Sequence, residues 1–306
     1  PLMKIVSLDL GTNSLILTVA EWNGTAFTPL FEDVQVVRLG QDLAKRGSLH
    51  PEAKKRCLKE LQNFSEKIAQ FEIENVLAAG TAALRNAGDG VQFVQEIEDQ
   101  LGLSFRIISG DEEASLTFKA IQHEFADLAQ QFIMIDIGGG SSELVVGDGD
   151  IILSKTSLEV GTVSFTERFV QHDPPAIDEL NAASSVIAEL MHQFPAGSTS
   201  SMAVGVAGTV TTLKAVDVEM DEYDPCAVHQ SQLNKDDVVR LGKLFRSMPT
   251  KQRVKIKGLP PMRADIIPMG ATILETLMKE LNLESVYVSD RGLRWGLLYD
   301  WIEKNG

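Results

Sequence analysis

One sequence pattern occurs twice in this chain and constrains its fold more than any other feature. Residues 3–14 read MKIVSLDLGTNS and residues 132–143 read FIMIDIGGGSSE. Each copy is an apolar run that ends in an aspartate and continues into a glycine-containing loop with small hydroxyl or amide side chains. A second apolar run and a hairpin signal follow, Asn23-Gly24 in one copy and Asp148-Gly149 in the other, which favour type I′ turns. Each copy therefore predicts consecutive strands with a glycine loop at the first turn.

A third element repeats at nearly the same distance in both halves. Gly80, in an Ala-Gly-Thr triplet, follows Asp9 by 71 residues, and Gly208, in a second such triplet, follows Asp136 by 72 residues. This matching order and spacing indicates that one βαβ-type domain was duplicated. We expect the two glycine loops to face each other across a cleft.

The chemistry of such loops favours a phosphate ligand. Glycine lets the main chain approach an anion closely and turn its N–H groups toward it, while Thr and Ser hydroxyls add donors. The aspartates at the strand ends, Asp9 and Asp136, would repel phosphate, so we expect them to hold a divalent cation or its water shell. The alternative is a pair of ordinary tight turns, which the matched spacing disfavours. The predicted phosphate-binding loop residues are Gly11, Thr12, Asn13, Ser14, Gly138, Gly139, Gly140, Ser141, Gly208 and Thr209.

Composition excludes several classes of protein. The chain has 306 residues, enough for two domains with separate cores, and no apolar run approaches the roughly 18 residues that span a bilayer. Its net charge of −15 argues against nucleic-acid binding. We identify no signal peptide, and the two cysteines, Cys57 and Cys226, form neither a metal cluster nor a disulfide framework. A reducing cytoplasm is the expected setting.

Hydrophobic periodicity predicts two α/β domains, at 1–128 and 129–306. In the first, three strands to about residue 39 precede alternating helices and strands, which implies a mixed sheet with helical crossovers. The second restarts at Phe132 and repeats the order. Helices are predicted near 51–70, 90–101, 111–125, 174–193, 235–248 and 291–304, and further strands at 75–79 and 104–108.

Two acidic positions are candidates for catalysis. Ser109 and Glu112 have the spacing of a capping box, which gives Glu112 a structural role and leaves Glu113 about 100° away around the helix. On the residues alone, these acids are better explained as partners of the helix dipole. Glu143 begins the strand after the second glycine loop, and alternation would point it toward a bound metal and phosphate; the alternative is a solvated strand end.

The chain resembles the exopolyphosphatase and guanosine pentaphosphate phosphohydrolase family (Ppx/GppA), in its short two-domain form. The resemblance covers almost the whole chain and depends on the joint order of its motifs. These are DLGTNS at 9–14, GTAALRNA at 80–87, ISGDEEASL at 108–116, DIGGGSSEL at 136–144, GVAGTVTTL at 205–213, RADIIPMGATIL at 263–274 and SDRGLRWGLL at 289–298.

The resemblance implies two duplicated actin-like (ribonuclease H-like) domains, with the last helix packing back on the first. It implies a phosphoric anhydride hydrolase of the stringent response that converts polyphosphate, guanosine pentaphosphate (pppGpp to ppGpp), or both. Glu113 would then orient or deprotonate water with Glu143, and Arg85 would bind phosphate, although a surface position at a helix end remains the alternative for Arg85. Mg²⁺ or another divalent cation would be held by Asp9, Asp136 and Glu143. A homodimer is left open as the assembly.

Residues 251–263 carry five cations and no acid, namely Lys251, Arg253, Lys255, Lys257 and Arg263. Gly258 and Pro260-Pro261 favour a loop, so we expect this basic stretch to follow the substrate tail rather than to be a solvated face. A second cluster, in 45–56, is interpreted as a solvated face.

Other functions remain open at this point. The chain lacks GxxxxGK[ST], which excludes the P-loop route to phosphate, and it offers neither a cysteine nucleophile nor a dinuclear His/Asp set. The alternatives are an ATP-using kinase of the same superfamily, a sensor that binds an alarmone or polyphosphate without catalysis, and an actin-like assembly protein. Departures from the family pattern are Gly80, Asp89, Ala207 and Trp295, of which Ala207 would most directly alter the fit of a substrate tail.

Overall fold

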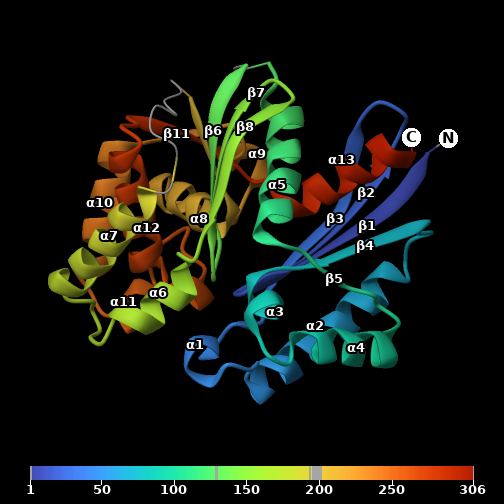
Figure 1. The fold of residues 1–306 in the computed structure, drawn as a ribbon, viewed down its shortest axis with the longest axis horizontal. Helices are drawn as coiled ribbons and strands as arrows, with labels where there is room; N and C mark the ends of the chain where they lie inside the picture. Colours follow the sequence, from blue (N-terminus) through green and yellow to red (C-terminus); the bar gives the residue numbers. More distant parts are fainter. Residues whose placement is uncertain (1, 128–129, 193, 195–201, 306) are drawn as a thin grey trace. The chain divides into compact units, whose positions relative to one another are not determined.

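The computed structural model describes residues 2–127, 130–192, 194 and 202–305. It divides into two compact units, which Figure 1 shows in ribbon form. The first unit comprises residues 1–120 and 293–306, and the second comprises residues 121–292. The units therefore divide inside a helix, between Ala120 and Ile121, whereas the predicted boundary at 128–129 falls outside the described residues.

The first unit is a five-stranded mixed sheet in the order β3-β2-β1-β4-β5 with helices on both faces. Its strands are β1 (Met3–Leu10), β2 (Ser14–Trp22), β3 (Phe27–Val36), β4 (Asn75–Gly80) and β5 (Arg106–Ile107). Its helices are α1 (Leu43–Arg46), α2 (Pro51–Ile68), α3 (Ala82–Asn86), α4 (Gly90–Leu101), most of α5 (Gly110–Phe125), and α13 (Leu293–Asn305).

Side chains alternate along β1 between two cores of the first unit. Val6 and Leu8 point to the core beneath α2 and α4, whereas Ile5 belongs to a cluster with Trp295 and Leu298 of α13. Figure 1 shows α2 and α4 on one side of this sheet and α13 on the other. The last helix of the chain thus completes the layer that covers the first sheet.

The second unit is a six-stranded mixed sheet in the order β10-β11-β9-β6-β7-β8. Its strands are β6 (Gln131–Ile137), β7 (Ser142–Asp148), β8 (Ile151–Leu158), β9 (Ala203–Val206), β10 (Gln232–Asn234) and β11 (Ser285–Ser289). Its helical elements are α6 (Thr162–Phe169), α7 (Ile177–Met191), α8 (Ala207–Asp217), α9 (Pro225–Val228), α10 (Lys235–Arg246), α11 (Thr250–Arg253), η1 (Pro261–Arg263) and α12 (Ile267–Glu280). Its core joins the sheet to α7, α8, α10 and α12.

The register of the strands supports a duplication. In the first sheet β1 lies between antiparallel β2 and parallel β4, and in the second sheet β6 lies between antiparallel β7 and parallel β9. Asp9 pairs with Ile16 and Asp136 with Glu143, each seven residues later. The third repeated element differs by one position, because Asp9 pairs with Ala79 but Asp136 with Val206, the residue before Ala207. That offset accounts for spacings of 71 and 72 residues.

The predicted hairpins are confirmed, but the predicted type I′ turns are wrong. A type I′ turn needs positive φ at both central residues, and here Gly24 and Gly149 have φ of 101° and 55° while Asn23 and Asp148 do not share that conformation. Asn23 instead accepts hydrogen bonds at Oδ1 from the N–H groups of Thr25 and Ala26, both at 2.9 Å, which turns the chain through its side chain. Among the helices that the structure describes, none is long and apolar enough to cross a membrane.

Candidate phosphate-binding and catalytic site

The two glycine loops close in the same way. Gly11 N–H donates to Ser14 O at 2.9 Å in the first unit, and Gly138 N–H donates to Ser141 O at 3.0 Å in the second. A β-carbon on Gly11 would lie 3.2 Å from Ser14 O, and one on Gly138 would lie 2.9 Å from Ser141 O. A side chain at Gly138 would force this turn to shift, and one at Gly11 would crowd it, so the loop itself favours glycine at both positions.

In each unit, the segment after the third strand packs closely against the glycine loop and hydrogen-bonds to its backbone. In the first unit, Gly40 N–H donates to Thr12 O at 2.9 Å, and a β-carbon on Gly40 would lie 2.3 Å from Thr12 Cγ2. In the second unit, a β-carbon on Gly161 would lie 2.3 Å from Gly139 O, and Val163 N–H donates to that oxygen at 2.9 Å. Gly40 and Gly161 were not predicted, although a glycine follows the third strand in both halves of the sequence.

The first loop contains two buried polar atoms that point to a ligand. Thr12 Oγ1 and Asn13 Oδ1 have no hydrogen-bond partner among the described residues, and these residues are only 6% and 5% exposed. Buried polar atoms are nearly always satisfied, so such a pair in one loop requires an explanation. A hydroxyl can donate to a phosphate oxygen, whereas an amide oxygen can only accept, as it would from a water on a hydrated cation.

Glu113 and Arg85, both in the first unit, are brought together. Arg85 lies on α3 and Glu113 on α5, with Arg85 Nη1 3.2 Å from Glu113 Oε2 and 2.8 Å from Ile108 O. The two side chains are 24% and 12% exposed. Arg85 therefore fixes the carboxylate that the sequence proposes as the base, a pairing that the sequence analysis did not predict.

The neighbouring Glu112 has a different environment. Its N–H donates to Ser109 Oγ at 3.1 Å, which confirms Ser109 as the helix cap, and its carboxylate pairs with Arg106. Its side chain is 38% exposed. Glu112 thus lies in the more exposed position at the helix cap, and Glu113 lies in the more enclosed one, as the helical offset predicted.

In the second unit, Glu143 and Asp136 lie directly opposite each other on β7 and β6. They are 1% and 7% exposed, so Glu143 is not a solvated strand end. Glu143 Oε1 accepts hydrogen bonds from Ser141 Oγ at 2.8 Å and Ser157 Oγ at 2.7 Å. Like charges directly opposite on neighbouring strands are unfavourable, so a cation near this pair would be stabilising. No group of three or more ligating side chains occurs in the described part of the chain, and Asp9 lies in the other unit.

The third repeated element, at residues 207–209 in the first turn of α8 and called the third loop below, receives an arginine that belongs to the basic stretch. Arg263 Nη2 lies 2.2 Å from where a β-carbon on Gly208 would stand, so only glycine admits this guanidinium. Burial lowers the pKa of Arg263 from its ordinary value, which means that a nearby anion would be favoured. A β-carbon on Gly270 of α12 would lie 2.8 Å from Thr209 Cγ2 and 3.3 Å from Thr162 Cγ2. Gly270 therefore lets α12 approach the first turns of α6 and α8.

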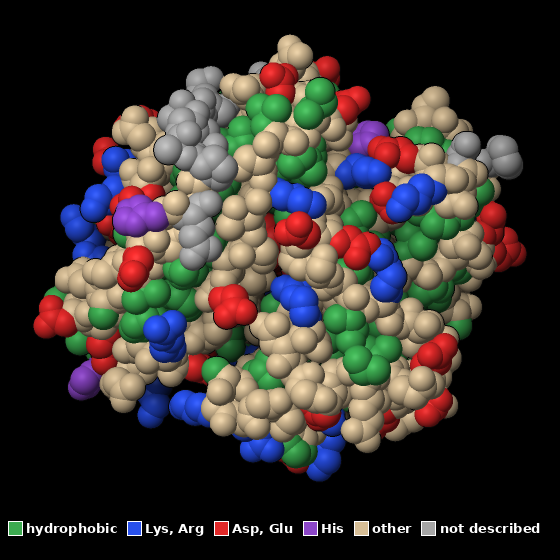
Figure 2. Space-filling view, viewed as in Figure 1, with side chains coloured by type: hydrophobic (Ala, Val, Ile, Leu, Met, Phe, Trp, Pro, Cys, Tyr) green, Lys and Arg blue, Asp and Glu red, His purple; other side chains and the backbone are tan. Residues whose placement is uncertain are grey.

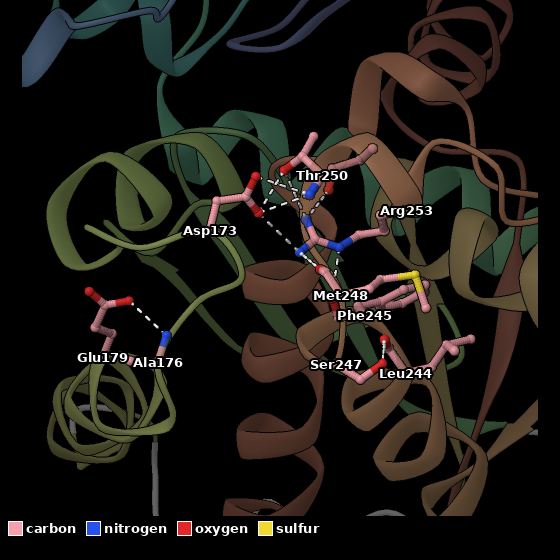
Figure 3. A network of polar contacts seen from close by, with 10 residues as sticks. Asp173, Ala176, Glu179, Leu244, Phe245, Ser247, Met248, Thr250 and Arg253 are labelled. Carbon is pink, nitrogen blue, oxygen red and sulfur yellow. Dashed lines mark hydrogen bonds and ion pairs between the residues drawn. The ribbon is translucent and has the colours of Figure 1, made fainter.

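Arg253 is not an exposed cation of the basic stretch. It is fully buried, and Figure 3 shows its guanidinium inside a ring of polar contacts. Its Nε donates to Phe245 O at 2.7 Å, Nη2 donates to Met248 O at 2.8 Å, and Nη1 donates to Ala264 O and to Thr250 Oγ1. The prediction that residues 251–263 form an open cationic loop is wrong for this residue, because backbone carbonyls of the surrounding turns capture its donors. Lys251 and Lys255 are exposed, and Lys257 pairs with Asp221 at 2.8 Å.

Two departures from the family pattern have structural explanations. Trp295 is 1% exposed and packs against Phe27 and Tyr299 in the core of the first unit. Asp89 accepts a hydrogen bond from Leu49 N–H at 2.8 Å and pairs with Lys54 at 2.6 Å. On the face shown in Figure 2, acidic and basic side chains are interspersed, so neither sign of charge is concentrated on that face.

Comparison with known proteins identifies the family. The profile described as the Ppx/GppA phosphatase family matches residues 18–305. The chain is 31% identical to exopolyphosphatase 2 of Mycobacterium tuberculosis over 314 residues, covering 97% of this chain and 98% of that protein. The crystal structure of the Aquifex aeolicus Ppx/GppA family member is 27% identical, with a TM-score of 0.85 and full coverage of both chains. The crystal structure of an exopolyphosphatase-like protein is 28% identical, with a TM-score of 0.92 and 98% coverage of both chains. The chain belongs to the Ppx/GppA phosphatase family, and its two mixed sheets form the actin-like α/β fold.

Proposed function

We propose that this protein is a metal-dependent phosphohydrolase that releases terminal orthophosphate from inorganic polyphosphate, from pppGpp, or from both. Membership of a phosphatase family and 31% identity to a protein named an exopolyphosphatase support this reaction class. Phosphoryl transfer is mainly a matter of positioning and electrostatic stabilisation, for which the glycine loops are suited.

The observation that carries the proposal is the pair of buried polar atoms in the first loop. Thr12 Oγ1 and Asn13 Oδ1 offer a donor and an acceptor at one point of the chain. A phosphate oxygen satisfies the first, and the water shell of a divalent cation satisfies the second. A ligand with an anion and a hydrated cation together fits both requirements.

The reaction follows from the residues that surround these loops. The N–H groups of the loops and Thr12 hold the terminal phosphoryl group, and Arg85 stabilises its charge. Glu113 accepts a proton from a water whose oxygen forms a new bond to phosphorus, while the anhydride P–O bond breaks and the shortened phosphate leaves. Glu143 orients the same water from its serine-supported position. Arg263 beside Gly208 and the exposed lysines of the basic stretch bind the remaining phosphates.

Asp136 and Glu143, with Asp9 of the first unit, are the residues that would hold Mg²⁺. Magnesium commonly keeps several waters and takes only one or two protein carboxylates plus substrate phosphates, so a cluster of three ligands is not required. The bound ion would neutralise phosphate charge. A cytoplasmic setting and a homodimer are further proposals that accompany this function.

Phosphate release from long polyphosphate, pppGpp and ATP in the presence of magnesium tests the proposal. We expect release from the first, the second or both, with loss of activity in EDTA and recovery on adding magnesium. Tight binding of these anions without phosphate release would identify a sensor instead. Transfer of phosphate from ATP to an acceptor hydroxyl would identify a kinase.

A further inference from the structure

Within the first unit, the segment after β3 holds the first glycine loop and continues directly into α1. Arg38 N–H donates to Asn13 O at 2.9 Å, and Gly40 N–H donates to Thr12 O at 2.9 Å. Leu43, the first residue of α1, donates through its N–H to Gly40 O at 3.2 Å. Such a turn keeps its first and fourth α-carbons within about 7 Å, so α1 begins close to the loop.

The other end of α1 is fixed to the connection between α3 and α4. Gly47 O accepts a hydrogen bond from Gly88 N–H at 2.9 Å, and Leu49 N–H donates to Asp89 Oδ1 at 2.8 Å. Figure 1 shows α1 near α3, the helix that carries Arg85. Although α1 is only one turn long, it is therefore a fixed element between the first glycine loop and the helix of Arg85.

Two exposed cations, Lys45 and Arg46, occupy adjacent positions on α1. Neither side chain has a hydrogen-bond or ion-pair partner among the residues that the structure describes. The segment 43–51 contains no acid that could neutralise them locally. The two charges are therefore held near the first glycine loop by the backbone of α1, and both are open to an anionic ligand.

The remaining cations of the cluster at 45–56 have partners within the first unit. Lys54 pairs with Asp89 at 2.6 Å, and Lys55 pairs with Glu52 at 2.8 Å. Arg56 donates to two oxygens of the segment before α1, at 3.1 and 2.9 Å. The interpretation of this cluster as a solvated face therefore needs revision for the two cations of α1.

The position of α1 favours a linear polyanion as the ligand. When a terminal phosphoryl group lies on the first glycine loop, the rest of a polyphosphate carries further negative charges away from that loop. Cations that meet such a chain displace its counterions, so binding gains free energy and depends on salt. A guanosine nucleotide has few phosphates and ends in an uncharged ribose and base, so it presents less charge at a distance from the loop.

We propose that Lys45 and Arg46 bind the tail of long polyphosphate and give the protein a preference for long chains over short ones. This inference rests on the proposed function for the position of the terminal phosphate. The site itself depends only on contacts within the first unit.

Lys45→Gln combined with Arg46→Gln tests this site, and Lys55→Gln combined with Lys59→Gln is the matched control. Both pairs remove two exposed positive charges from the first unit, but Lys55 and Lys59 lie on the exposed face of α2. The measured quantities are kcat and KM for polyphosphates of increasing length and for pppGpp. We expect the α1 variant to raise KM for long polyphosphate by about 5- to 20-fold, as for two surface ion pairs.

In the same variant, kcat for long polyphosphate should stay within about twofold, as should KM for triphosphate and for pppGpp. The control variant should leave every value within about twofold. An equal rise in KM for short and long chains, or an equal rise in the control, would indicate general electrostatic attraction and overturn the proposal. An unchanged KM for long polyphosphate would overturn it as well.

A binding measurement separates this inference from the proposed function. The affinity for labelled long polyphosphate is measured in EDTA, where no phosphate release is expected. The α1 variant should lose affinity by a similar factor and show a flatter dependence on salt than the control. If the wild-type protein releases no phosphate from any substrate, the proposed function fails, and this binding result still decides whether the site exists. Failure of the wild-type protein to bind long polyphosphate would overturn the inference.

Discussion

Two adjacent carboxylates on α5 show how one helical step separates two roles. Glu112 lies outward, pairs with Arg106 and follows a serine cap, whereas Glu113 is held by Arg85, which also donates to the backbone oxygen of Ile108. An arginine that fixes a carboxylate through one nitrogen can also meet an incoming phosphate, because the guanidinium has five donors in a fixed fork. The ion pair is therefore compatible with a role for both residues in one reaction.

Glu113→Gln is expected to keep the fold and lower phosphate release by about 100-fold or more, the usual effect of losing a general base. Glu112→Gln should leave turnover close to that of the wild type and lower the free energy of unfolding by no more than about 1 kcal/mol, because its ion pair is exposed. Initial rates and urea unfolding of both variants provide the measurement. Equal turnover in the two variants would remove Glu113 from the reaction.

The buried thiol of Cys57 makes stability depend on pH in the alkaline range. Burial raises the pKa of Cys57 from 9.0 to about 12, so the folded protein keeps the proton while the unfolded chain loses it above about pH 9. The sign follows from linkage: this contribution is fully present below pH 9 and is lost as pH rises toward 12, by up to about 1.4 kcal/mol per pH unit. Urea unfolding of the wild type should show this slope between pH 9 and 11. Cys57→Ala should reduce it, and Cys226→Ala, at an exposed thiol, should not.

At the scale of elements, the turns between α10 and α12 depend on Arg253. Its guanidinium joins carbonyls at the end of α10, in the following turn and just after η1, and Asp173 approaches it at 3.7 Å. Burial lowers the pKa of Arg253, and Asp173 opposes that shift. Since η1 ends at Arg263, this network also determines where the third loop meets its arginine.

Arg253→Lys keeps the charge but cannot reproduce the fork of donors, so several carbonyls would lose their partners. We expect a loss of about 3–5 kcal/mol in the free energy of unfolding, the range for breaking a buried charged network. Lys255 is exposed and lies outside this network. Lys255→Met should therefore change the free energy of unfolding by less than about 0.5 kcal/mol. Thermal and urea unfolding compare the two. A small effect of Arg253→Lys would show that the network adapts to an ammonium group.

Elements with a clear period were predicted well, and elements fixed by distant contacts were not. The helix predicted at 90–101 is α4, Gly90–Leu101, and the helix predicted near 235–248 is α10, Lys235–Arg246. The basic stretch was misread because a run of cations on a turn-rich segment gives no sign that the carbonyls of the neighbouring turns, five to eleven residues away, hold one of them. Likewise, Ala207 adopts a left-handed φ of 70°, where glycine is favoured. The sequence showed that alanine replaces the glycine of the family pattern, but it did not predict this backbone conformation.

In the candidate site, too, the residues that follow a local pattern were predicted, and their tertiary contacts were not. Repetition revealed both glycine loops, the aspartates and Glu143, because these residues follow strands whose order is fixed by local pattern. The contacts of Arg85 with Glu113 and of Arg263 with Gly208 depend on tertiary packing, so spacing could suggest the residues but not their partners. A comparison of glycines between the two halves would have added Gly40 and Gly161.

At the scale of the whole molecule, the first unit is discontinuous in sequence and the second is continuous. Residues 1–120 form the first sheet, but α13, from the end of the chain, covers the face that carries Ile5, Ala20 and Phe27. Trp295 and Leu298 supply the apolar contacts of that cover.

This arrangement determines an order of events on the ribosome. The first unit is translated early yet must wait for the last helix, while the second unit can assemble as soon as residue 292 has emerged. A nascent chain would thus carry an uncovered apolar sheet face for most of its synthesis, a surface suited to chaperone binding. Limited proteolysis of a chain that stops at residue 292 should cleave within 1–120 while sparing 121–292. Equal resistance of both segments would mean that the first sheet matures without its final helix.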